Sequence, residues 1–79
     1  MRSFVKDIVL NNISFQVHFN EYYSPNGKRY FVFAGNRHGD SYSFNMERKE
    51  NEWRIVDAPR VHECFLNNEK KLSDLINES

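Results

Sequence analysis

The sequence predicts an α+β fold, namely a five-stranded antiparallel meander sheet with a C-terminal helix packed on one face. Two observations lead to this prediction. Apolar and polar residues alternate through most of the chain before Asp57, which is the period of half-buried strands. After Asp57 the period becomes helical, because Phe65, Leu72 and Ile76 recur at offsets that fall on one helix face.

The first hairpin is predicted by the Asn11-Asn12 pair. Asparagine tolerates the positive φ that a two-residue hairpin turn requires. A turn at this position pairs Phe4 with Phe19 and sets apolar side chains opposite one another on a single face. That face is expected to be the core side of the sheet.

The second hairpin is marked by Pro25-Asn26-Gly27. Proline cannot adopt the positive φ of a primed two-residue turn, so we expect a three-residue turn closed by Gly27 in the left-handed region. This choice pairs Phe19 with Phe33 and places Phe33 in the core.

Two further turns complete the meander. A loop over residues 36–39, between Gly35 and Asp40, leads into a strand whose Tyr42 faces inward. A polar turn at Lys49-Glu50 is expected to set Met46 opposite Trp53.

The terminal helix is the only amphipathic segment that can cover the apolar face of the sheet. A strongly coiled sheet that wraps this helix as a half-barrel remains an alternative to an open sheet with the helix lying across it. The chain is predicted to be one domain, residues 1–79, with strands at about 3–10, 13–23, 29–34, 41–48 and 53–57 and helical segments at about 59–66 and 68–78.

Charge and cysteine content bear on location and partners. Eleven Lys and Arg balance eleven Asp and Glu, so no global field attracts nucleic acid or an anionic membrane. The single cysteine, Cys64, cannot form an internal disulfide, which favours a reducing, cytoplasmic location. No signal peptide or membrane-spanning run is recognised in the sequence, so we expect no membrane association.

Candidates for chemistry are few. His62 and Cys64 form the only close pair of soft metal ligands, and their spacing does not match a zinc site. His38 and Asp40 lie in a polar hairpin loop, with no nucleophile that the sequence places beside them. We therefore expect no metal, no cofactor and no catalytic residues, and hence a protein that is not an enzyme.

The face of the sheet that the helix leaves uncovered is the candidate binding surface. With the expected registers, its central residues are Tyr22, Tyr30, Val32, Asn45, Arg54 and Val56. Tyrosine and arginine on an uncovered face are typical of protein-interaction sites, although a Tyr22–Tyr30 pair is also an ordinary stabilising contact on a solvated sheet. We expect a protein partner or a second copy, bound through this face or through the first strand as a free edge. The alternative is a single-stranded nucleic-acid or RNA-binding module that uses Lys28, Arg29 and Arg54.

Overall fold

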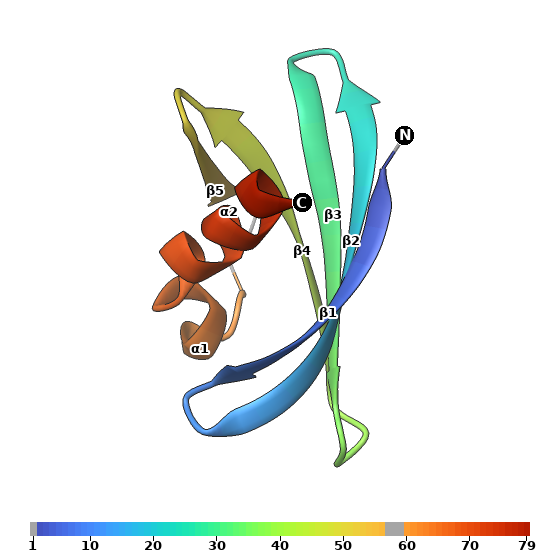
Figure 1. The fold of residues 1–79 in the computed structure, drawn as a ribbon, viewed down its shortest axis with the longest axis vertical. Coiled ribbons are helices and arrows are strands. Elements are labelled where there is room, and N and C mark those ends of the chain that lie inside the picture. Colours follow the sequence, from blue (N-terminus) through green and yellow to red (C-terminus); the bar gives the residue numbers. More distant parts are fainter. Residues whose placement is uncertain (1, 57–59) are drawn as a thin grey trace.

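The structure is a computed structural model, and it describes residues 2–56 and 60–79. These residues form one antiparallel sheet of five strands in the order β1-β2-β3-β4-β5, followed by two helices (Figure 1). The predicted α+β meander with a C-terminal helix is confirmed. The strands are β1 Ser3–Leu10, β2 Ile13–Ser24, β3 Gly27–Asn36, β4 Ser41–Lys49 and β5 Glu52–Val56, and the helices are α1 Glu63–Leu66 and α2 Glu69–Glu78.

The sheet curls around the helices, so that α2 forms hydrogen bonds with both edge strands of the sheet, β5 and β1. At one end, Ile55 in β5 donates its backbone N–H to Glu69 at 2.9 Å. At the other, Lys71 Nζ donates to the Val9 carbonyl at 3.0 Å. Figure 1 shows the β1–β2 hairpin curving beneath α1 while β5 lies beside α2. This arrangement encloses one face of the sheet and leaves the other uncovered by any described element.

The core lies between the enclosed face and the helices. Phe15, Phe44 and Trp53 are buried there with Leu72 and Ile76, as the alternation and the helical period predict. Phe65 of α1 joins the same cluster, and its ring centroid lies 5.2 Å from those of Phe15 and Phe44.

The first hairpin has the predicted register. Asn11 and Asn12 adopt φ of 51° and 66°, and Phe4 pairs with Phe19. Their rings stack with centroids 4.7 Å apart.

The predicted register of the second hairpin was wrong by one residue. Ser24 pairs with Gly27 across a two-residue turn, so Val32 and not Phe33 lies opposite Phe19. Gly27 takes a φ of 117° within the ladder itself and does not form an extra bulged residue. A shift of one residue turns every side chain of a strand to the opposite face. The observed register sets Val32 between Phe19 and Phe44, which alternates small and large side chains across the core.

The next connection shifts the register by one residue again. Val32 pairs with Phe44 and Phe33 with Ser43, where the loop over 36–39 was expected to set Phe33 opposite Tyr42. The second shift cancels the first, and β4 therefore presents Phe44 and Met46 to the core as predicted.

The last hairpin turn was placed one residue too early. It lies at Glu50-Asn51, with Lys49 paired to Glu52, and Met46 consequently faces Ile55 instead of Trp53. Moving the turn by one residue moves the pairing by two, which preserves the faces. Trp53 remains buried.

The helical region is shorter than expected at its start. Residues 60–62 precede α1 without helical structure, and Pro59 lies outside the described residues, as does residue 57 at the end of the predicted fifth strand. His62 Nδ1 accepts the backbone N–H of Cys64 at 3.1 Å and so caps the first turn of α1. Asn68 precedes α2, but its side chain donates to the Cys64 carbonyl at 2.6 Å and does not cap α2.

Candidate functional site

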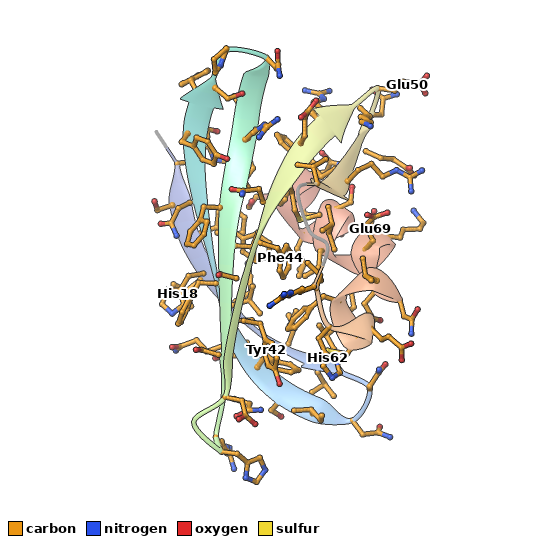
Figure 2. All side chains as sticks on the ribbon, turned by 180° about the vertical axis from the view of Figure 1, so that it is seen from behind. His18, Tyr42, Phe44, Glu50, His62 and Glu69 are labelled. Atoms are coloured by element: carbon orange, nitrogen blue, oxygen red, sulfur yellow. The ribbon has the colours of Figure 1, made fainter. Side chains whose placement is uncertain are left out.

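The uncovered face of the sheet, called the open face below, carries two exposed aromatic rings at its centre. Phe31 and Phe33 of β3 are 40% and 41% exposed. They lie two residues apart on the middle strand, so both side chains point to the same side. Figure 2 shows His18 of β2 pointing away from the helices on this side, whereas Phe44 points toward them.

One row of side chains crosses the open face from edge to centre. It consists of Val5, His18, Phe33 and Ser43, each paired with the next across neighbouring strands. The rings of His18 and Phe33 meet edge to face, with centroids 6.1 Å apart and an interplanar angle of 68°. His18 Nε2 also lies 3.3 Å from Gln16 Oε1. The row, called the central row below, combines apolar area with an imidazole held in place.

A hollow of about 560 Å³ opens beside the central row. Gly35 is one of the residues that line it, two positions from Phe33 on β3, and carries no side chain to fill it. A Cβ built on Gly35 would meet only the Asp40 carbonyl, at 3.9 Å. The hollow can therefore accept a side chain from a partner. Its lining residues are Asp7, Ser14, Phe15, Gln16, His18, Phe33, Gly35, Asn36 and Arg37.

Four of the six predicted site residues belong to this face. Tyr22 and Asn45 are joined by a 2.7 Å hydrogen bond from the tyrosine hydroxyl to Asn45 Oδ1. Arg54 and Val56 lie on the same side of β5, next to Glu47 and Asn45 of β4. Their place on the face was predicted, and their role in binding stays a prediction.

The other two predicted residues, Tyr30 and Val32, lie in the core, so their placement on the open face was wrong. The shifted register of β3 is the physical reason. The Tyr30 hydroxyl donates to Glu21 Oε2 at 3.3 Å. Burial, with the nearby Glu21 charge, raises the pKa of Tyr30.

Phe31, Phe33 and the neighbouring His18 were not predicted as site residues from the sequence. Apolar residues occupy both faces of β3 over residues 30–34, so hydrophobicity alone does not show which face of this strand is buried. The only signal was the choice between a two-residue and a three-residue turn at Pro25-Asn26-Gly27.

Charges around the open face are matched by opposite charges. Arg29 contacts Glu47 at 2.8 Å, with both side chains largely buried. Arg54 lies 2.9 Å from Glu69 and 3.3 Å from Glu52. The hydrogen bond with Glu69, followed by the two carboxylate charges, raises the pKa of Arg54. Arg29 and Arg54 are therefore already paired with carboxylates within the chain.

The candidates for chemistry lie apart from this face. His62 packs against Tyr42 with ring centroids 5.5 Å apart, on the side where Figure 2 shows the helices. Burial raises the pKa of the neighbouring Cys64 thiol. Within residues 2–56 and 60–79, no group of three or more His, Cys, Asp or Glu side chains is arranged to hold a metal ion.

The loop that joins β3 to β4 is organised by an asparagine. Asn36 Oδ1 accepts the backbone N–H groups of His38 and Asp40 at 2.9 and 3.1 Å. The Asp40 carboxylate accepts a hydrogen bond from the Asn36 amide at 3.3 Å, and the His38 and Asp40 side chains are both exposed. These contacts give the polar cluster a role in turn geometry.

No protein-family model matches the chain, and no match is found among curated proteins or solved structures. In the part of the chain that the structure describes, every helix is too short or too polar to span a membrane. Inference about function therefore starts from the physical chemistry of the open face.

Proposed function

We propose that this chain is a small cytosolic, non-enzymatic domain that binds a protein through the open face of its sheet. The observation that carries the proposal is the exposure of Phe31 and Phe33 at the centre of a face that no described element covers. Burial of an exposed aromatic pair against a partner stabilises the complex by about 25 cal/mol per Å² of apolar area removed from water. A core position would have given the same gain within the chain, yet β3 places Tyr30, Val32 and Ala34 there.

The surroundings of the two rings match the anatomy of a protein interface. Interfaces combine an apolar, aromatic centre with a polar rim, and their binding energy concentrates in a few aromatic and arginine side chains. Here the centre is Phe31 and Phe33, and the rim includes the Tyr22–Asn45 pair. The hollow at Gly35 adds a recess in which a partner's side chain can anchor.

A single-stranded nucleic acid is the second candidate, favoured by one observation. Two aromatic side chains on the middle strand of an open sheet can stack successive bases. Phosphate binding also needs available cations, and Arg29 and Arg54 are paired with carboxylates. Lys28 likewise lies 3.5 Å from Glu21. Lys28, Arg29 and Arg54 would each have to leave a carboxylate partner to bind phosphate, and this is why a protein is preferred.

The test compares the wild-type chain with a Phe31→Ser/Phe33→Ser variant as bait in an extract of the native host. Tyr23→Ser is the control, since Tyr23 is exposed at the β2–β3 hairpin tip, away from the centre of the face. We expect the wild type and Tyr23→Ser to retain the same proteins, also after nuclease treatment of the extract. The double variant should not retain them. Retention of the same proteins by a folded double variant would contradict the proposal. Binding to a mixed oligonucleotide at about 50 mM salt, where phosphate contacts are strong, would favour the second candidate instead.

A further inference from the structure

The two edges of the sheet are treated differently by the rest of the chain. At β5, the backbone N–H groups of Trp53 and Ile55 point outward and are bonded by Ser73 and Glu69 of α2, at 2.8 and 2.9 Å. The helix therefore closes this edge. At β1, among the residues that the structure describes, α2 contributes one hydrogen bond, from Lys71 to the carbonyl of Val9 near the hairpin end.

The hydrogen-bonding pattern shows which groups of β1 point outward. Glu21 donates its N–H to the Arg2 carbonyl at 2.8 Å, so even-numbered residues of this segment bond to β2. Hydrogen-bonded and non-hydrogen-bonded pairs alternate along an antiparallel ladder. The N–H and C=O groups of Ser3, Val5 and Asp7 therefore point away from the sheet. The bond between Lys71 and the Val9 carbonyl agrees with this parity.

We infer that β1 pairs antiparallel with β1 of a second copy, in the register that sets Val5 opposite the second copy's Val5. In this register Ser3 lies opposite the second copy's Asp7, and the pair recurs by two-fold symmetry. The outward groups of Ser3, Val5 and Asp7 are then all bonded. The Val9 carbonyl, already occupied by Lys71, is not needed.

Charge selects this register over its neighbours. Centring the pairing on Lys6 or on Asp7 sets a like charge opposite itself, and a shift toward the N-terminus sets Arg2 opposite Lys6. Like charges directly opposite one another destabilise a strand pair. Centring on Val5 avoids all three, with Lys6 facing Phe4 and Asp7 facing Ser3. The same charges that protect the edge against foreign strands are thus compatible with a copy of the chain.

The pairing also explains the exposure of Val5 and extends the open face. Val5 is 48% exposed and ends the central row at the sheet edge. In the dimer it meets its counterpart, and the central rows of the two copies join into one row that crosses eight strands. The pairing uses the β1 edge of the sheet and not the centre of the open face, so it can be tested independently of the proposed function.

Sedimentation analysis over a range of concentrations tests the inference with a matched pair of variants. Ser3→Lys and Ser3→Asp both remove the hydroxyl that bonds Asn20, and they change the net charge of zero by equal and opposite amounts. We expect a monomer–dimer equilibrium that Ser3→Lys tightens by about 2- to 30-fold, since the new pair with Asp7 forms twice, and that Ser3→Asp weakens.

Val5→Pro removes an outward N–H at an edge position, where proline is tolerated, and is expected to abolish the dimer while circular dichroism stays native. Phe31→Ser should leave the dimerisation constant unchanged, which separates this test from that of the open face. A wild-type chain that stays monomeric at millimolar concentration would overturn the inference. Equal dissociation constants for Ser3→Lys and Ser3→Asp would overturn the register.

Discussion

The backbone N–H of Trp53 donates a 2.8 Å hydrogen bond to Ser73 Oγ, which joins β5 to α2 in the interior of the protein. Glu69, one turn earlier on the same helix face, accepts the N–H of Ile55. Two side chains of the helix thus satisfy the donors that a sixth strand would otherwise have to bond.

Ser73→Ala should lower the free energy of unfolding by about 1–3 kcal/mol, because it leaves the buried Trp53 N–H without an acceptor. Urea denaturation measures the change. Ser43→Ala is the matched control, since Ser43 is exposed on the open face, and it should shift stability by at most about 0.5 kcal/mol. Equal losses in the two variants would mean that the bond between β5 and α2 adds nothing.

Phe44→Ala should be more costly, at about 3–5 kcal/mol. Phe44 is buried on the enclosed face, next to Phe65, and truncation leaves a cavity that the surrounding structure closes only in part. The midpoint of thermal unfolding should fall far more than in Ser43→Ala, one position along the strand. Similar midpoints would show that the faces of β4 are assigned the wrong way round.

The elements that the sequence predicted well are those with a single compatible turn. Asn11-Asn12 admits a two-residue turn with positive φ, and the register of β1 and β2 follows from it. The helical period likewise identified Leu72 and Ile76 as core residues. In both regions local geometry and hydrophobic pattern point to the same answer.

The candidate site was predicted less well, because it depends on β3. Pro25-Asn26-Gly27 is compatible with turns of two or three residues, and β3 is apolar on both faces, so neither signal fixes its register. The choice between Phe33 and Val32 as the core residue is made by packing between Phe19 and Phe44. Such packing is a tertiary property that a strand's own sequence does not reveal. Tyr22 was placed correctly because the face of β2 follows from the first turn, and Asn45, Arg54 and Val56 were placed correctly because the second shift cancelled the first.

Stability should fall in acid through Glu21. Burial raises the pKa of this carboxyl, but the Lys28 charge and hydrogen bonds from the Arg2 backbone, Tyr30 and Lys28 together bring it below the ordinary value of 4.5. A carboxyl whose pKa is lowered by folding stabilises the protein fully above its unfolded pKa. That contribution is lost as the pH falls through the folded pKa.

Glu21→Gln removes this titration. The difference in unfolding free energy between the wild type and the variant, measured in urea from pH 6 to pH 3, should therefore shrink as the pH falls. A difference that stays constant or grows over this range would contradict the assignment.

Cys64 should be unreactive in the folded protein. Its thiol is buried, and burial raises its pKa, so little thiolate is present at neutral pH. Its reaction with a disulfide reagent should follow the rate of unfolding, and it should accelerate in urea. Rapid native-state labelling would show that the packing of α1 on the sheet is not as described.

The binding surface depends on the register of β3, because this register places Phe31 and Phe33 on the open face. Its most direct test is thiol labelling of Phe31→Cys and Val32→Cys, each in a Cys64→Ala background, under native conditions. The structure predicts that Phe31→Cys is labelled at the rate of an exposed thiol, while Val32→Cys is labelled only as fast as unfolding exposes it. Fast labelling at position 32 with protection at position 31 would contradict the register and the binding surface built on it.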